Sequence, residues 1–172
     1  MKNELTELKF IVDINAGKLV KWLRIMGYDS LLFTDKDDGK MVKIALNENR
    51  IILTKDTHIL ERRLITSGKV KAILIEGDDP KQQLEQVVTT LELDFSYKPF
   101  SMCLECNLNL IERSKEQVSN LVPEHVFNTQ TTYMECPSCH RIFWKGTHWQ
   151  AMSDKLASFK KKKQKASGVV KI

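Results

Sequence analysis

Short apolar runs alternate with helix-like periodicity between residues 9 and 93. Four runs predict buried strands, at 10–12, 30–33, 50–54 and 70–75. Four other stretches, at 16–26, 41–45, 57–66 and 84–91, predict helices, and Gly27 is expected to end the first of them. Continuous apolar strands separated by helices indicate a parallel sheet that is covered on both faces. The pattern therefore predicts an α/β fold.

Three segments are expected along the chain. The α/β domain should span 1–98, a loop-rich cysteine domain 99–150, and a basic tail 151–172. Hydrophobic residues make up 42% of the sequence, which is enough for a packed core. The start lacks the apolar stretch of a signal peptide, and no run reaches membrane-spanning length. We therefore expect a cytoplasmic protein with no membrane partner.

All the cysteines lie in two pairs of equal spacing, Cys103-Leu-Glu-Cys106 and Cys136-Pro-Ser-Cys139. A two-residue spacer lets both sulfurs of a turn face one ion at about 2.3 Å, and two such turns complete a tetrahedral site. The 29 residues between the pairs are ordinary for a zinc ribbon. The alternative is two disulfides, or buried thiols that only pack. We predict a structural zinc.

Acidic residues follow every predicted strand. They are Asp13, then Asp35, Asp37 and Asp38, then Asp56, then Asp78 and Asp79. Because ligand crevices form at the carboxyl edge of a parallel sheet, these carboxylates are expected to converge. Such oxygen ligands suit Mg²⁺ or Mn²⁺, and a metal held there can activate water against a phosphodiester. The alternative is that Asp38 and Asp56, which both precede helices, only cap them.

Other catalytic arrangements have less support in the sequence. It contains neither a G-x-G-x-x-G nor a G-x-x-x-x-G-K-[ST] phosphate-binding loop. His58 is the only histidine of the α/β region, and we expect it on a helix face rather than as a catalytic base.

Positive charge is concentrated at the end of the chain. The net charge is +5, but residues 151–172 alone contribute +6 and the first 150 residues contribute −1. A lysine run suits a polyanion because phosphate contacts release counterions. The alternative is a solvated terminus that only aids solubility. The candidate nucleic-acid contacts in this run are Lys160, Lys161, Lys162 and Lys163.

Several motifs together resemble the Mut-seven C-terminal RNase family, a PIN-like nuclease group. In the α/β region they are the segment from Asp13 to Asp29, Ile44-Ala45, and Arg50 to Asp56. Farther on they are Cys103 to Asn107, Cys136 to Cys139, Phe143-Trp144, and Gly146 to His148. The similarity spans roughly residues 10–152.

The resemblance implies a PIN-like parallel sheet with flanking helices, followed by a small zinc ribbon. It implies cleavage of RNA with Mg²⁺ or Mn²⁺, and it maps the family's acidic positions onto Asp13, Asp38 and Asp56. Asp78 is a candidate for a fourth acid. We expect further nucleic-acid contacts from basic residues near the acidic edge and from the ribbon: Lys18, Lys21, Arg24, Lys55, Trp144, Lys145 and His148. Trp22 is expected in the core instead.

Two functional hypotheses remain open from the sequence. The first is a metal-dependent ribonuclease whose zinc ribbon and basic tail bind RNA. The second is a non-catalytic adaptor with the same fold, which binds RNA or, through the ribbon, a protein partner. The nearly neutral charge of the first 150 residues favours the second hypothesis, and the acids at the strand ends favour the first.

Overall fold

The computed structural model describes residues 7–166, without the side chains of residues 160 and 162–166. Contacts between residues divide the chain into two compact units, Met1–Asn107 and Leu108–Ile172. This division falls after the first cysteine pair, whereas the sequence places the start of the ribbon at residue 99. The first cysteine turn groups with the α/β unit because hydrogen bonds attach it there: Arg24 donates to the Leu104 carbonyl, and Asn107 Oδ1 accepts the N–H of Ser30.

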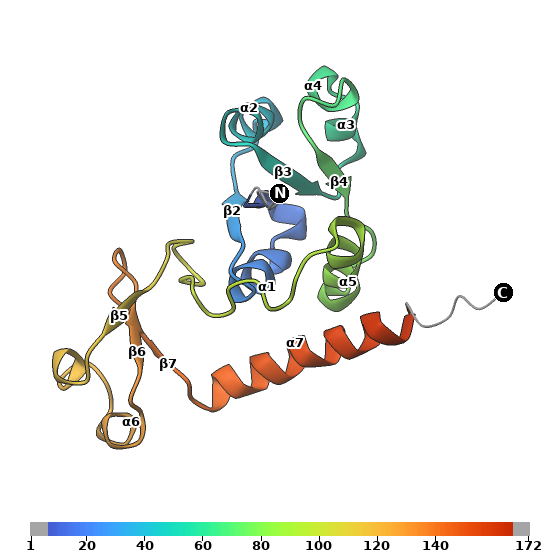
Figure 1. Ribbon diagram of the computed structural model, residues 1–172. Helices are drawn as coiled ribbons and strands as arrows, with labels where there is room; N and C mark the ends of the chain where they lie inside the picture. The colour runs from blue at the N-terminus through green and yellow to red at the C-terminus, as the bar shows by residue number, and fades with distance from the viewer. Residues whose placement is uncertain (1–6, 167–172) are drawn as a thin grey trace, which may run out of the picture. The chain divides into compact units, whose positions relative to one another are not determined.

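Four parallel strands form the sheet of the first unit (Figure 1). They are β1 (Lys9–Asp13), β2 (Asp29–Phe33), β3 (Arg50–Thr54) and β4 (Ala72–Leu74). The strand order is β2-β1-β3-β4, and each neighbouring pair is parallel. The predicted parallel sheet is confirmed, although β4 is shorter than the run 70–75. All four strands therefore end at the same edge.

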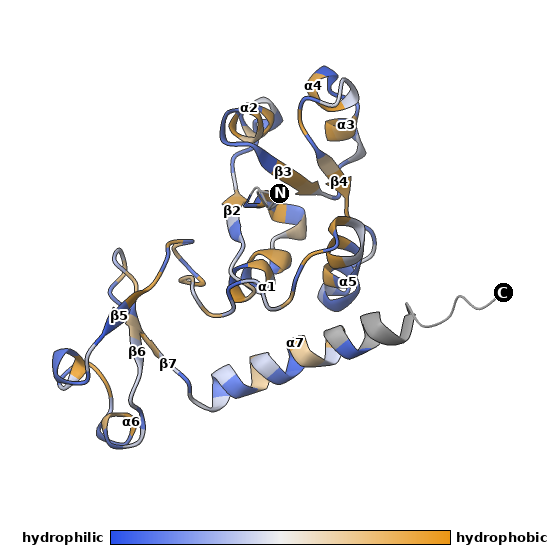
Figure 2. Cartoon of the chain, in the orientation of Figure 1, coloured by the Kyte–Doolittle hydropathy of each residue, from blue (hydrophilic) through white to orange (hydrophobic). Residues whose placement is uncertain are grey.

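Helices cover both faces of this sheet. The helices α2 (Asp38–Glu48), α3 (Thr57–Leu60) and α4 (Arg63–Thr66) lie on one side, and α1 (Lys18–Ile25) and α5 (Pro80–Leu91) lie on the other (Figure 1). Ile11 packs with Met41 and Ile59 on the first side. Phe10 and Val12 must face the opposite side because side chains alternate along a strand. Figure 2 shows hydrophobic and hydrophilic residues alternating along α1, α2 and α5, as amphipathic helices require.

Glycine and aspartate residues mark the ends of several of these helices. Gly27 follows α1 with a φ of 89°, and its N–H donates to the Arg24 carbonyl at 3.0 Å. Side chains of Asp37, Asp56 and Asp79 accept backbone N–H groups at the starts of α2, α3 and α5. The single helix expected at 57–66 is interrupted and forms α3 and α4.

The second unit contains a small antiparallel sheet. Its strands are β5 (Ile111–Arg113), β6 (Tyr133–Glu135) and β7 (Ile142–Trp144), in the order β5-β6-β7. Between β5 and β6 come a 3-10 turn, Glu116–Val118, and the helix α6 (Glu124–Thr129). Tyr133 is fully buried with Val118 and Val126, and its hydroxyl donates to the Gln130 carbonyl at 2.9 Å. These three side chains form a small hydrophobic core. The segment between β5 and β6 supplies two of them, because a sheet of this size cannot form such a core by itself.

Residues 151–166 of the expected basic tail belong to a helix, α7 (Thr147–Ala166). The side chains of Leu156 and Phe159 on this helix are buried. Residues 167–172 lie outside the described residues, as do the side chains of Lys160, Lys162 and Lys163. Among the helices that the structure describes, none combines the length and the apolar content needed to cross a membrane.

Candidate functional site

The strand order places the carboxyl ends of β1 and β3 at a topological switch point. From β1 the chain crosses outward to β2 on one side, and it then returns to β3 on the other side. The connections that leave the ends of β1 and β3 therefore diverge, and a crevice forms between them in sheets of this kind. Asp13 is the last residue of β1, and Thr54 is the last residue of β3.

Thr54 links the two strand ends by hydrogen bonds. Its side chain is fully buried, and its hydroxyl donates to Asp13 Oδ2 at 2.8 Å. The same hydroxyl accepts the backbone N–H of Asp56 at 3.0 Å. Thr54 thus orients the carboxylate of Asp13 and fixes the turn that presents Asp56. Sequence reasoning missed this residue, although a threonine two positions before an aspartate is typical of such a turn.

The other two predicted acids make helix-start and ion-pair contacts. Asp56 Oδ1 accepts the backbone N–H of His58 at 2.9 Å, so Asp56 caps α3. The cap of α2 is Asp37 rather than Asp38, and Asp37 accepts the N–H of Gly39 at 2.9 Å. Asp38 is the first residue of α2, and its carboxylate lies 3.6 Å from Arg62 Nη2. The capping alternative therefore applies to Asp56 and not to Asp38.

Two of the predicted acids, Asp13 and Asp56, use only one carboxylate oxygen in their hydrogen bonds with described residues. Asp13 Oδ1 and Asp56 Oδ2 accept no hydrogen bond from any described residue, so each acid keeps one oxygen for a cation. Within the described part of the chain, the cysteines are the only group of three or more ligating side chains close enough to hold an ion. Asp13 and Asp56 each offer carboxylate oxygens, the donor type that hard divalent cations prefer.

Two lysines lie near the same edge. The Lys55 ammonium forms an ion pair with Asp78. The backbone N–H of Lys55 donates to Asn15 Oδ1 at 3.1 Å. The hydrogen bond from Lys55 holds the pKa of Asp78 below its ordinary value, and the charges of Lys55 and Lys18 act in the same direction. Asp78, the candidate fourth acid, is therefore engaged with a lysine.

The other two predicted basic contacts of the first unit lie beside the first cysteine turn. Lys21 Nζ lies 3.2 Å from Glu105, and both side chains are largely exposed. Arg24 is only 6% exposed and donates to backbone carbonyls of Ser30, Leu104 and Glu105. Trp22, expected in the core, is half-buried. Arg24 therefore acts inside the protein and is not available to bind RNA.

The four cysteines form the clearest ligand cluster. One Sγ atom from each lies within 4.8 Å of all the others, and the residues are thiols rather than halves of disulfides. Tetrahedral zinc with sulfur ligands at about 2.3 Å requires sulfur–sulfur separations of about 3.8 Å. The cluster is therefore compatible with a structural zinc, as the cysteine spacing predicts.

The two cysteine turns share one backbone geometry. Asn107 and His140, which follow the second cysteine of each turn, both have a φ of 58°. Their N–H groups donate to the carbonyls of Cys103 and Cys136 at 3.1 and 3.0 Å. In the first turn the N–H of Cys106 also approaches Cys103 Sγ at 3.5 Å, a contact that stabilises a thiolate.

Histidines near the ribbon cysteines lie outside the sulfur cluster. His140 Nδ1 lies 2.8 Å from Glu135 Oε1, and Arg113 Nε donates to the same carboxylate at 2.6 Å. These contacts lower the pKa of Glu135, with the hydrogen bond to His140 as the larger cause. His148 is exposed at the second position of α7. The sulfur cluster has four members without either histidine.

The predicted RNA contacts of the second unit differ in exposure. Trp144 is partly buried against the Val118, Val126 and Tyr133 core. The Lys145 ammonium lies 5.2 Å from the centre of the Trp149 ring, a cation–π distance, and Lys145 is exposed. Lys161 is exposed as well. Lys145 and Trp149 therefore lie side by side where α7 begins, and His148 is exposed next to Trp149 in the sequence.

Comparisons with known proteins now identify the family. The model of the Mut7-C RNAse domain family matches residues 8–156, which is well over half of the chain. The comparisons with curated proteins and with solved structures gave no match. The match includes the strand-end acids and all four cysteines, in agreement with the motifs of the sequence. The chain therefore belongs to the Mut7-C RNAse domain family.

Proposed function

We propose that this protein is a divalent-metal-dependent ribonuclease that hydrolyses RNA phosphodiesters at the carboxyl edge of the parallel sheet. The main support is the hydrogen-bonded chain from Asp13 through Thr54 to Asp56 at the switch point between β1 and β3. Membership of an RNase family supports RNA as the substrate and phosphodiester hydrolysis as the reaction.

Each residue at this edge has a proposed role. Asp13 and Asp56 would be the direct ligands of Mg²⁺ or Mn²⁺, and Asp38 would be a third ligand or a hydrogen-bond acceptor beside the ion. When bound, such a cation lowers the pKa of a water molecule and neutralises charge on the phosphodiester. Thr54 holds Asp13 in one orientation. The ion pair of Asp38 with Arg62 is half-exposed, and such pairs contribute little free energy, so Asp38 can exchange partners at low cost.

Cations beside these acids bind the RNA backbone. Lys55 and Lys18 lie near the acidic edge and are proposed to hold phosphates of the substrate. When RNA enters, Lys55 exchanges Asp78, which is fully exposed, for a phosphate oxygen. A phosphate contact of this kind positions the strand without reading its sequence.

The second unit is proposed to bind RNA through contacts of its own. Trp149, with Lys145 beside its ring, and His148 offer a stacking surface next to positive charge, which suits unpaired bases. Trp144, which is partly exposed, adds a further aromatic side chain, and Lys160 to Lys163 add electrostatic attraction. A zinc ion bound by the four cysteines would join the two cysteine turns, and it has no role in the proposed hydrolysis.

A non-catalytic adaptor that binds RNA or protein is the second candidate function. It is favoured by the contacts of Asp38 with Arg62 and of Asp56 with the start of α3, because both acids already have structural roles. The same fold and zinc centre would then present the ribbon to a partner without cutting RNA.

Cleavage of end-labelled single-stranded and structured RNA distinguishes the two functions. Mg²⁺ or Mn²⁺ is added to metal-free buffer, because strong chelators would also remove a thiolate-bound zinc. We expect cleavage that depends on the added metal and falls to background in Asp13→Asn and Asp56→Asn. Asp79→Asn is the control, since Asp79 caps α5 and has no proposed catalytic role. RNA binding without cleavage under either metal would establish the adaptor.

A further inference from the structure

Arg24 connects the α/β unit to the first cysteine turn through three backbone carbonyls. Its Nε and Nη2 atoms donate to the Ser30 carbonyl at 3.1 and 2.8 Å. Its Nη1 atom donates to the carbonyls of Leu104 and Glu105 at 2.5 and 3.0 Å. Leu104 and Glu105 are the two residues between Cys103 and Cys106. One buried guanidinium therefore fixes the spacer that separates two of the thiols.

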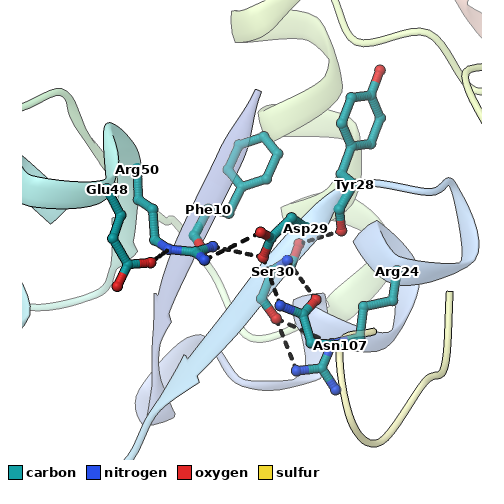
Figure 3. Close-up of polar contacts among 8 residues, drawn as sticks. All are labelled: Phe10, Arg24, Tyr28, Asp29, Ser30, Glu48, Arg50 and Asn107. Atoms are coloured by element: carbon teal, nitrogen blue, oxygen red, sulfur yellow. Dashed lines mark hydrogen bonds and ion pairs between the residues drawn. The ribbon is translucent and has the colours of Figure 1, made fainter. Parts of the chain in front are cut away.

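Asn107 makes the matching connection from the other side of the turn. Figure 3 shows its side chain between Asp29 and Ser30. Its Oδ1 accepts the backbone N–H of Ser30 at 2.8 Å, and its Nδ2 donates to Asp29 at 2.5 Å. Asp29 in turn accepts two hydrogen bonds from Arg50, at 2.6 and 3.1 Å. The turn is thus attached to β2 and, through Asp29, to β3.

These contacts use the open edge of the sheet. β2 is an edge strand, so backbone groups on its outer side have no neighbouring strand to pair with. At Ser30, Asn107 satisfies the outward N–H and Arg24 satisfies the carbonyl. The cysteine turn is therefore attached at defined backbone atoms, which fixes its orientation more closely than an apolar contact would.

We propose that Arg24 and Asn107 are positioning residues of the zinc centre, which hold Cys103 and Cys106 as a preorganised half-site on the α/β unit. This inference depends on the zinc site proposed above. A half-site ordered before the metal arrives loses less conformational freedom on binding, and outer contacts of this kind commonly change metal affinity about 10- to 100-fold. Neither residue contacts the metal, and their effect on it is indirect.

Arg24→Lys and Asn107→Gly test this proposal. Lysine keeps the charge but cannot donate in a fork to several carbonyls at once. Glycine tolerates the φ of 58° at position 107 while removing the amide. Gln83→Met is the control, because Gln83 is a buried polar residue of the same unit whose amide donates to a backbone carbonyl, that of Gly77 at 2.9 Å, outside the Arg24, Asn107 and Asp29 network.

Three measurements are made on full-length protein purified with its native metal. They are zinc content, the rate of zinc transfer to a chromogenic chelator, and the melting temperature of zinc-loaded and zinc-depleted protein. We expect both variants to release zinc at least about 10-fold faster. The rise in melting temperature that zinc produces should shrink in both variants, but not in Gln83→Met. Cobalt-substituted variants should keep thiolate charge-transfer bands, because all four cysteines remain.

Each other outcome contradicts a specific claim. Wild-type protein without zinc would refute the zinc centre itself. Zinc-containing wild type whose release rate is unchanged by both substitutions would refute the positioning role alone. An equal loss of melting temperature with and without zinc would also refute it, because that result describes a purely structural contribution of Arg24 and Asn107 to the α/β fold. None of these results depends on RNA cleavage.

Discussion

Thr54 illustrates how one buried hydroxyl can define a candidate active site. It donates to one acid and accepts from the backbone of another, so both of its hydrogen-bonding roles are used at the carboxyl edge of the sheet. Burying a hydroxyl without such partners would cost free energy. These two hydrogen bonds remove that cost, so a polar residue can end an otherwise apolar strand. Asp13 and Asp56 were predictable from the sequence because they follow strands. Thr54 was not, because its role depends on a contact between strands.

Replacing Thr54 with valine should impair cleavage much more than it destabilises the fold. Valine keeps the β-branched shape but leaves Asp13 without its donor, so we expect cleavage to fall about 10- to 100-fold. Unfolding by urea should show a loss of about 1–3 kcal/mol from the lost hydrogen bonds. Thr54→Ser retains the hydroxyl and should keep most of the activity. Wild-type cleavage by Thr54→Val would show that the orientation of Asp13 is unimportant.

Gly27 is a residue whose backbone leaves no room for a side chain. A Cβ atom at this position would lie 2.2 Å from the Lys98 carbonyl oxygen, and φ is 89°. We expect Gly27→Ala to destabilise the protein by about 2 kcal/mol or more in a urea titration, from the unfavourable φ and the steric overlap together. Gly68→Ala is the matched control, because Gly68 has a φ of 76° but nothing within 4 Å. Equal losses for both would contradict the role of Lys98.

At the scale of elements, β2, β3 and the first cysteine turn are joined through Asp29. Burial acts to raise the pKa of Asp29, but hydrogen bonds from Arg50 and Asn107 outweigh it, and the pKa is lowered overall. A carboxyl whose pKa is lower in the folded state stabilises the fold above its unfolded pKa of about 3.9. That contribution disappears as the pH falls through the lower folded value.

Asp29→Asn should therefore change how stability responds to acid. Between about pH 7 and about pH 3 we expect the free energy of unfolding of wild-type protein to fall more steeply than that of the variant. Urea denaturation followed by circular dichroism at several pH values measures this difference. Glu76→Gln, which alters an exposed acid outside the network, is the control. Parallel curves for wild type and Asp29→Asn would contradict the link.

The sequence predicted elements best where one local pattern was sufficient. Continuous apolar runs placed β1, β2 and β3 within a residue of their observed ends. The helix at 57–66 is divided at Glu61 and Arg62, which apolar spacing does not reveal. The structure places residues 151–166 of the predicted tail in α7, whose lysine run lacks an apolar stripe. The roles of Arg24 and Asn107 were hidden because their partners are about 80 residues away in sequence.

For the whole molecule, the zinc centre is expected to hold together segments that are distant in sequence. Cys103 and Cys139 are separated by 35 residues, yet their sulfurs belong to one cluster. Cys103→Ser removes one thiolate, so elemental analysis should show a loss of zinc and limited proteolysis should cut residues 108–146 faster. Ser138→Ala, between the two cysteines of the second pair, is the control that keeps all four thiols. Full zinc content in Cys103→Ser would contradict the four-thiolate site.

Positive charge is concentrated in residues 151–172, so the proposed binding of RNA should depend on the lysine run there. Deleting the tail would also remove Leu156 and Phe159, which are buried, so substitution is the cleaner test. Glutamine at Lys160, Lys161, Lys162 and Lys163 should weaken RNA binding. It should also lower the slope of log affinity against log salt by about 0.7 for each lysine that contacts a phosphate.

The matched control replaces four exposed lysines of the first unit with glutamine, namely Lys36, Lys43, Lys69 and Lys71. Both variants have a formal net charge of +1 instead of +5, so a general charge effect would weaken binding equally in the two. Fluorescence anisotropy with labelled single-stranded RNA at several salt concentrations measures both quantities. If the tail binds phosphates directly, only the first variant loses slope, because counterions are released where contacts form. An unchanged slope in that variant would leave the lysine run with a solubility role.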